Sequence, residues 1–152
     1  MTRGTGFVLF RLGDQTFATA LDDVREIVRL EGLETLPGAR PPLAGVIVLR
    51  GAPLPVLDVR AAGAERGDVL VMDLEDDTVG IAVDQVAAVL GPDDLPEGDA
   101  VPRSLPPYVV GVRRHAGGPV MLVDLHRLLD VAATGWESAL SADPERASTP
   151  SS

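Results

Sequence analysis

The sequence predicts a mainly β protein built from two small five-stranded sheets packed together, with short helices that include one near the C-terminus. Hydrophobic residues make up 45% of the 152 residues and aromatic residues only 3%, so aliphatic side chains that suit strands must fill the core. The 16 glycines and 13 prolines indicate frequent turns and argue against a helical bundle. An internal repeat is the third observation.

The elements of the first half follow from short apolar runs between turn residues. The first two runs meet at Gly13-Asp14, which is typical of a β-hairpin. The spacing of Val24, Ile27 and Val28 fits either one helical turn or a short strand. We expect a turn of helix that passes into a strand. The expected elements are strands at 7–12 and 15–20, a helical turn at 21–25, and strands from there to about 30, at 45–49 and at 52–58.

The second half shows the same order of apolar runs. Loops rich in proline and glycine are expected at 36–43 and 91–107, and the last eleven residues have the composition of a disordered tail. We expect the 131–152 tail to be helical to about Leu140 and disordered beyond. The expected elements are strands at 68–74, 78–83, 86–90, 108–114 and 119–123, and a short helix at 125–129.

The two halves align with each other. Residues 8–28 can be laid on 70–90, where six positions are identical and the apolar rhythm agrees almost throughout. Residues 45–58 can be laid on 111–124 without a gap, and shared Gly, Gly, Pro and Asp positions keep their order. We interpret this as two copies of one five-stranded unit, with lobe one at about 7–60 and lobe two at about 69–129.

Two prolines constrain where their strand can lie. Pro53 and Pro55 remove two N–H donors from the same side of one strand, so that side cannot pair fully. Such a strand belongs at a sheet border or at a gap in a barrel. A strongly bent sheet of about 50 residues buries little apolar surface by itself. We therefore expect the two sheets to pack against each other around a crevice.

Charge and composition exclude several classes of protein. The net charge is −10, and all 13 basic residues are arginines, so a phosphate backbone would be repelled and nucleic acid is not an expected partner. The absence of cysteine excludes disulfides and thiolate metal sites. There is no signal-peptide core and no apolar run long enough to span a membrane, so we expect a cytoplasmic protein.

The polar residues offer little catalytic chemistry. Asp58, Asp84 and Asp124 end apolar runs and could serve acid–base or metal chemistry, but no partner stands at ligand spacing, and capping of the following segments is the simpler interpretation. His115 and His126 lack a nucleophile that would complete a triad, and the glycine turns lack the lysine of a phosphate loop. No catalytic residue, metal site or cofactor is therefore predicted.

Arg50 is the most informative polar residue. It lies where an apolar strand enters a turn, and Gly51 follows it. Its guanidinium could form an internal bond that shapes the crevice, or it could contact a partner. Ala116 takes its place in the second copy, so the strand frame does not require an arginine.

Four apolar residues occupy matching positions in the two copies: Val24, Ile27, Val86 and Val89. They could be ordinary core residues. Alternatively, some apolar surface left exposed between the lobes would mark a site that binds another protein.

A set of motifs in a consistent order resembles the CheW-like domain family. The motifs are PhexLeuGly at the first hairpin, AspValArgGluIleVal, LeuProGly at 36–38, GlyValIleValLeuArgGly, ProValLeuAspValArg, ValAspGlnVal and TyrValValGlyVal. The resemblance covers about 7–129 and implies two small five-stranded SH3-like β-barrels. The chain departs from the family at Val48, where an asparagine is common, and in its short 60–68 connection.

The resemblance implies a non-enzymatic adaptor of bacterial chemotaxis. Such adaptors join the regulatory domain of a CheA-type histidine kinase to the cytoplasmic hairpin tips of methyl-accepting chemoreceptors, and they are recruited to receptor arrays at the membrane. The mode would be apolar anchoring of a helix in a groove, oriented by an arginine. The partner-binding residues expected on this basis are Val24, Ile27, Gly45, Leu49, Arg50, Val86 and Val89.

Two alternatives remain at this stage. One is a CheW-like module of a different signalling assembly. The other is an enzyme or metal-binding protein that uses the carboxylates of Asp58 and Asp124.

Overall fold

The computed structural model describes residues 5–39, 41–60, 64–74, 77–98 and 100–131. Nearly all regular structure in these ranges is extended, as the composition predicted. The strands are β1 (Phe7–Leu12), β2 (Gln15–Ala20), β3 (Glu26–Arg29), β4 (Leu43–Leu49), β5 (Ala52–Asp58), β6 (Asp68–Leu74), β7 (Asp77–Val83), β8 (Gln85–Leu90), β9 (Val109–His115) and β10 (Gly118–Val123). A 3₁₀ turn, η1 (Leu21–Asp23), precedes β3, and residues 125–131 are helical.

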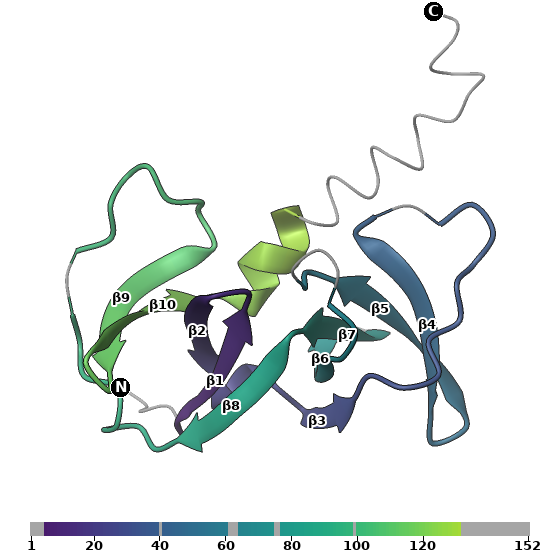
Figure 1. Cartoon of the computed structure of the whole chain (residues 1–152), viewed down its shortest axis with the longest axis horizontal. Coiled ribbons are helices and arrows are strands. Elements are labelled where there is room, and N and C mark those ends of the chain that lie inside the picture. Colours follow the sequence, from purple (N-terminus) through teal and green to yellow (C-terminus); the bar gives the residue numbers. More distant parts are fainter. Residues whose placement is uncertain (1–4, 40, 61–63, 75–76, 99, 132–152) are drawn as a thin grey trace, which may run out of the picture.

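These strands form two five-stranded sheets, so the predicted fold class is confirmed. The first sheet has the order β8-β1-β2-β10-β9, and the second has the order β3-β6-β7-β5-β4. The two sheets lie on either side of the 125–131 helix, and β3 and β8 run along the opposite side of the molecule (Figure 1). Predicted and observed strands agree to within about two residues at their ends.

The strand pairing does not follow the predicted lobes. Each sheet contains the first hairpin of one half and the last three strands of the other: β1 and β2 pair with β8 and β10, while β6 and β7 pair with β3 and β5. The predicted lobes, at about 7–60 and about 69–129, follow the internal repeat of the sequence, whereas each sheet combines strands from both of them. The exchange occurs because β3 leaves its own hairpin and pairs with β6 over Glu26–Arg29.

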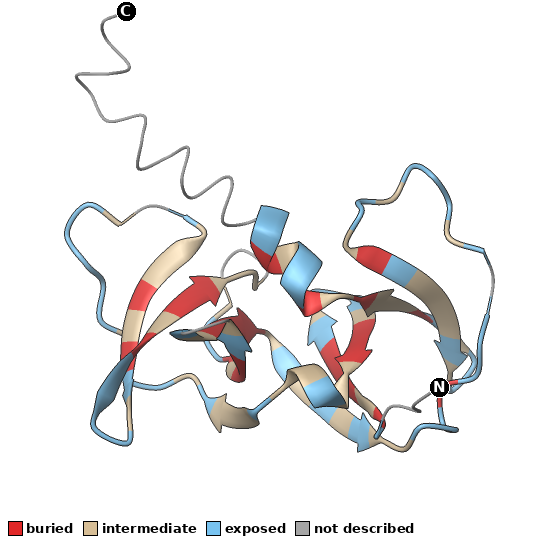
Figure 2. Cartoon of the chain, turned by 180° about the vertical axis from the view of Figure 1, so that it is seen from behind, coloured by how far each residue is buried: buried red, intermediate tan, exposed pale blue. Residues whose placement is uncertain are grey.

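The core has three layers, because the central strands are buried on both faces. In β6, Leu70 and Met72 point between the sheets, while Val69 and Val71 point into the second sheet's own interior. The layer between the sheets includes Phe10 and Phe17, which stack with ring centroids 5.8 Å apart. Buried residues occur on strands of both sheets and on the helix between them (Figure 2). The predicted crevice is thus largely filled, and surface remains only along its margins.

Pro53 and Pro55 open a gap in the second sheet, as predicted from the missing donors. The pairs Val48–Pro53 and Val46–Pro55 alternate with the hydrogen-bonded pairs of the β4–β5 hairpin, so the proline nitrogens face β7. Pairing of β5 with β7 accordingly begins only at Val56. β5 is not an edge strand; the gap lies within the sheet.

The helix over 125–131 begins at an aspartate, as expected. The Asp124 carboxylate accepts hydrogen bonds from the backbone N–H of His126 at 2.9 Å and of Arg127 at 3.2 Å, which is an N-cap. Leu125 and Leu129 pack into the layer between the sheets. The prediction of a helix to about Leu140 followed by disorder concerns residues outside the described ranges.

Candidate functional site

Arg50 and Gly51 form the turn between β4 and β5. Their φ values of 48° and 82° lie in the left-handed region, which is the geometry of a two-residue type I′ hairpin. Ala116 and Gly117 form the β9–β10 turn with φ values of 53° and 82°. The two copies of the repeat therefore share the backbone conformation of this turn, and the turn itself does not need the arginine.

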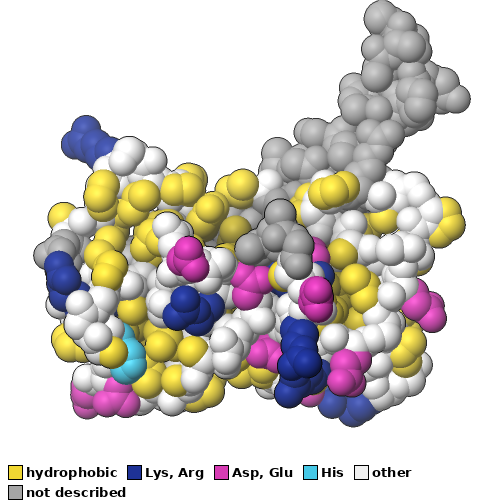
Figure 3. Space-filling model, viewed as in Figure 1, with side chains coloured by type: hydrophobic (Ala, Val, Ile, Leu, Met, Phe, Trp, Pro, Cys, Tyr) yellow, Lys and Arg dark blue, Asp and Glu magenta, His cyan; other side chains and the backbone are white. Residues whose placement is uncertain are grey.

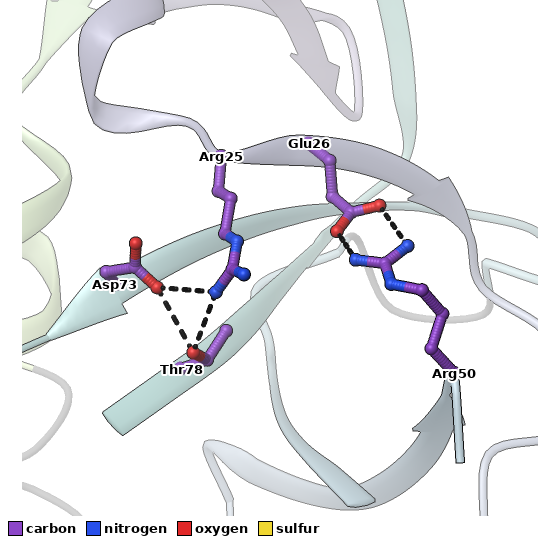
Figure 4. A network of polar contacts seen from close by, with 5 residues as sticks. All are labelled: Arg25, Glu26, Arg50, Asp73 and Thr78. Atoms are coloured by element: carbon purple, nitrogen blue, oxygen red, sulfur yellow. Dashed lines mark hydrogen bonds and ion pairs between the residues drawn. The ribbon is translucent and has the colours of Figure 1, made fainter. Parts of the chain in front are cut away.

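Glu26 holds the Arg50 side chain in place. Arg50 Nη1 donates to Glu26 Oε1 at 3.0 Å, and Nη2 donates to Oε2, so both carboxylate oxygens are used (Figure 4). The hydrogen bond from Arg50 is the main cause that lowers the pKa of the Glu26 carboxyl, and it raises the pKa of Arg50 in turn. Arg50 remains 65% exposed, compared with 25% for Glu26. The guanidinium is thus oriented by the fold and still accessible.

A second ion pair lies beside the first. Arg25 Nη1 donates to Asp73 Oδ1 at 3.1 Å and to Thr78 Oγ1 at 3.4 Å, and the Thr78 hydroxyl donates to the same Asp73 oxygen at 3.1 Å (Figure 4). Arg25 lies directly before β3, Asp73 lies in β6 and Thr78 lies in β7. Arg25 and Thr78 line the same pocket as Pro53.

A shallow pocket of about 260 Å³ lies between these charged groups. Leu49 and Leu54 form its apolar floor, and the polar network forms its rim. An oriented cation beside an apolar depression can recognise a partner side chain by shape and charge together. The lining residues are Arg25, Glu26, Leu49, Arg50, Ala52, Pro53, Leu54, Val71 and Thr78.

The first sheet has a pocket in the equivalent place, and its chemistry differs. The repeat alignment relates nearly every lining position of the two pockets. At about 360 Å³ the second pocket is larger, and it has alanine at positions 87 and 116 where the first has Arg25 and Arg50. Arg11 replaces Asp73, and His115 replaces Leu49. Of these two equivalent pockets, the one in the second sheet thus has the ion pairs of Arg25 and Arg50 beside it.

The apolar residues predicted to bind a partner differ in their exposure. Val24, Ile27 and Val86 are partly buried against the layer between the sheets, on the side where β3 and β8 run. Val89 is 57% exposed. It lies on the same face of β8 as Val86, because a bulge at this point of the strand pairs Val89 with Val8 and Val86 with Phe10, and Val8 and Phe10 share one face of β1. Charged side chains of both signs lie among hydrophobic ones on the face shown in Figure 3.

Gly45 has a backbone role. It is buried at φ 153°, and a Cβ there would lie 2.1 Å from the carbonyl oxygen of Glu34. Glu34 and Val46 exchange backbone hydrogen bonds of 2.8 and 2.9 Å directly beside it. Gly45 is buried and has no side chain, so its place among the predicted partner-binding residues rests on the resemblance alone.

The carboxylates proposed for catalysis are used within the fold. Arg60 donates to Asp58 through its backbone N–H and Nε, both at 2.9 Å, and through Nη2 at 2.8 Å; the side-chain hydrogen bonds are the main cause that lowers the pKa of Asp58. Asp84 accepts a hydrogen bond from the backbone N–H of Gly13, and Asp124 caps the helix. His126 Nδ1 lies 4.0 Å from Asp23 Oδ1.

A search of the described residues for three or more His, Asp or Glu side chains that could hold a metal ion found none. Within the same residues, no helix is both long and apolar enough to cross a membrane.

Sequence reasoning missed Glu26, Arg25 and Asp73. Glu26 and Arg25 stand inside the AspValArgGluIleVal motif, which carries the resemblance but does not by itself single out its charged members. The sequence shows that Glu26 and Arg50 have opposite charges, but many other acidic residues could pair with an arginine in the same way.

The comparisons with known proteins agree with this architecture. The family model described as the CheW-like domain matches residues 6–133. The chain is 26% identical over 135 residues to a chemotaxis protein CheW of Treponema pallidum, covering 80% of this chain and 79% of that protein. It is 36% identical over 94 residues to the chemotaxis protein CheW of Rhizobium meliloti, covering 57% and 61%.

A solved structure has the same fold. The scaffolding protein TtCheW from Thermoanaerobacter tengcongensis superposes with a TM-score of 0.68 at 20% identity, covering 84% of this chain and 89% of that one. With the family model matched over most of its length, this chain belongs to the CheW-like domain family.

Proposed function

We propose that the protein is a non-enzymatic adaptor of a chemotaxis signalling assembly. In this proposal it couples the regulatory domain of a CheA-type histidine kinase to the hairpin tips of methyl-accepting chemoreceptors. It works in the cytoplasm and is recruited to receptor arrays at the membrane. Family membership and the names of the chemotaxis relatives support this function.

The observation that carries the proposal is the state of Arg50. Its guanidinium is held by Glu26 yet is 65% exposed beside an apolar pocket, while the equivalent turn has an alanine. A side chain that is already ordered loses less entropy on binding. An exposed, oriented arginine next to Leu49 therefore resembles the anchor of a protein interface more than a stabilising surface pair.

The apolar margin of the junction supplies the other part of the proposed site. Val24, Ile27 and Val86 are partly exposed over a rigid core. A helical hairpin tip that places apolar side chains on these positions would bury them without reorganising the sheets. Val89 lies on the same face of β8 as Val86 and extends this margin, with 57% of its surface exposed.

The test is calorimetric titration of the full chain with the kinase regulatory domain and, separately, with a soluble receptor hairpin from the same cell. Arg50→Ala should weaken binding to at least one of them about tenfold or more, the loss typical of an interface anchor. Arg103→Ala removes another exposed arginine and should leave both affinities unchanged. Folded wild-type protein that binds neither partner would overturn the proposal.

A charge exchange separates the two roles that Arg50 could have. The double variant Glu26→Arg with Arg50→Glu keeps an ion pair between the two positions. If the pair only shapes the pocket, the double variant should regain the affinity lost in Arg50→Ala. We expect it to remain weak, because a carboxylate would then face the partner.

A further inference from the structure

The pocket of the first sheet contains basic and polar side chains that the fold does not pair. Arg11 of β1, Thr16 of β2 and His115 of β9 line this pocket of about 360 Å³, and the buried Leu9 and Val120 form its apolar base. Among the described residues, no hydrogen bond or ion pair engages the guanidinium of Arg11, the hydroxyl of Thr16 or the imidazole of His115. Arg11 is exposed, and the other two are half-buried. The pocket therefore presents hydrogen-bond donors above an apolar surface.

The equivalent pocket of the second sheet shows how the fold itself neutralises a charge at this position. Asp73 and Thr78 are paired across β6 and β7, and Arg25 contributes the opposite charge from the segment directly before β3. Its guanidinium lies 3.1 Å from the Asp73 carboxylate and 3.4 Å from the Thr78 hydroxyl, which itself donates to that carboxylate. Each member of this group of three thus has a partner within the chain.

The first sheet keeps this frame but reverses the charge. Arg11 and Thr16 are paired across β1 and β2 in the register of the equivalent pair. The repeat alignment places Ala87 where Arg25 stands, and a methyl group can neither carry a charge nor accept a hydrogen bond. An ion pair at Arg11 needs an anion, and no described residue supplies one.

The donors of this pocket fit a carboxylate. A guanidinium binds both oxygens of a carboxylate through parallel N–H groups, and a threonine hydroxyl can donate to one of the same oxygens. The alanines at positions 87 and 116 stand where the second pocket has arginines, and the first pocket is accordingly larger. The methylene groups of a glutamate or aspartate side chain would cover the apolar base, whereas an inorganic anion would leave it exposed to water.

The pocket adjoins the strand that carries part of the proposed receptor site. β8 is an edge strand of the first sheet, where Val86 packs against the layer between the sheets and Ala87 lines the pocket. Arg11 is paired with Gln85 of the same strand. A helical hairpin that covers Val86 would therefore bring its neighbouring side chains close to the pocket.

We propose that Arg11 and Thr16 bind the carboxylate of an acidic side chain on the receptor hairpin. This contact rests on the proposed function, and it adds a charged docking point to the apolar margin. His115 would donate a further hydrogen bond from the end of β9. A second copy of this chain is a poorer occupant, because two molecules with a net charge of −10 repel each other.

Charge reversal at Arg11 tests the proposal in titrations of the full chain with a soluble receptor hairpin. Arg11→Glu should weaken binding about tenfold or more, because two carboxylates would then face each other, and Arg11→Gln should weaken it less. Arg11 is exposed and makes no side-chain bond to a described residue, so both variants should melt at the wild-type temperature. Arg66→Glu makes the same charge change at an exposed arginine before β6 and should leave the affinity unchanged.

A compensating change on the hairpin identifies the contact. Replacing one acidic residue of the hairpin by lysine should restore affinity to Arg11→Glu but not to Arg50→Ala, and the absence of any such residue would overturn the proposal. If the wild type and Arg11→Glu bind the hairpin equally, this proposal fails while the proposed function stands. If the folded wild type does not bind the hairpin, both fail. An effect of Arg11→Glu confined to the kinase domain, to self-association or to the binding of inorganic phosphate would also overturn it.

Discussion

Arg50 and Ala116 occupy the same place in two copies of one hairpin, and both adopt a left-handed backbone with φ of 48° and 53°. Each is followed by a glycine at φ 82°. A residue with a Cβ is mildly strained in this region, and asparagine and glycine tolerate it best. Nothing in the turn itself favours arginine over alanine, so the interaction of Arg50 with Glu26 and its accessibility account for it better than hairpin formation does.

Ala116→Asn should stabilise the protein. Asparagine followed by Gly117 is the preferred sequence of a type I′ turn, and the free energy of unfolding should rise by about 0.5–1 kcal/mol. Urea titration would measure the change. Ala87→Asn, at an exposed alanine within β8, serves as the control and should give no gain, because asparagine is disfavoured in strands. Equal effects of the two changes would contradict the turn explanation.

Gly45→Ala should be severely destabilising. The new Cβ would lie 2.1 Å from the Glu34 carbonyl oxygen, and the φ of 153° is unfavourable for alanine, so a loss of roughly 3 kcal/mol or more is expected. Gly111 holds the equivalent position in the repeat, where the nearest atom to a Cβ would be a Leu122 side-chain carbon at 3.3 Å. Gly111→Ala should therefore destabilise the protein much less. Thermal melting of both variants would measure the difference, and equal losses of stability would show that the contact with Glu34 is unimportant.

Asp58→Asn should lower the free energy of unfolding at neutral pH and should hardly change it at acidic pH. Hydrogen bonds from Arg60 hold the pKa of Asp58 below its usual value of 3.8, so the stabilisation is present above that value and is lost as the pH falls through the lower folded-state pKa. For a partly exposed pair we expect a loss of about 1 kcal/mol near neutrality. Urea titrations across the acid range would measure it.

Arg60→Gln removes the other member of this pair and should give the same pH profile. A loss that stays constant down to strongly acidic pH would instead mean that the two side chains act through packing rather than charge. Arg60→Gln would also remove the hydrogen bond that Arg60 Nη1 donates to the carbonyl of Arg66 at 3.2 Å, which links the end of β5 to the segment before β6.

Val86→Ala and Val89→Ala should differ in stability although the residues lie three positions apart. Val86 packs against the layer between the sheets, and its truncation should lower the free energy of unfolding by about 1 kcal/mol. Val89 is 57% exposed, and its truncation should change that energy by less than about 0.5 kcal/mol. Equal losses would mean that β8 is twisted differently from the structure described above.

Much of the local structure could be predicted because it depends on neighbours in the chain. The Gly13-Asp14 hairpin, the strands predicted at 45–49 and 108–114, and the Asp124 cap follow from short apolar runs, turn residues and a capping preference. The gap beside β5 follows from Pro53 and Pro55 alone, since a missing donor is a property of the residue. These features needed no knowledge of distant contacts.

The exchange of hairpins was not predicted, and the reason is physical. Strands pair through backbone groups that nearly every residue carries, so the continuous apolar run of β6 indicates burial on both faces but not which strand lies at its edge. The same limit hid the partnership of Glu26 with Arg50, because it arises only where β3 joins the sheet of the other half.

By itself, the sequence determined the strand class, the duplicated frame, the turn geometry and the place of Arg50 within it. Tertiary structure alone decided which hairpin completes which sheet, how far the junction is filled, and that Glu26 holds the arginine in an accessible position. The difference is one of range: chain neighbours settle the first group through backbone preference, whereas the second depends on contacts between segments tens of residues apart, which many pairings of similar aliphatic strands could satisfy.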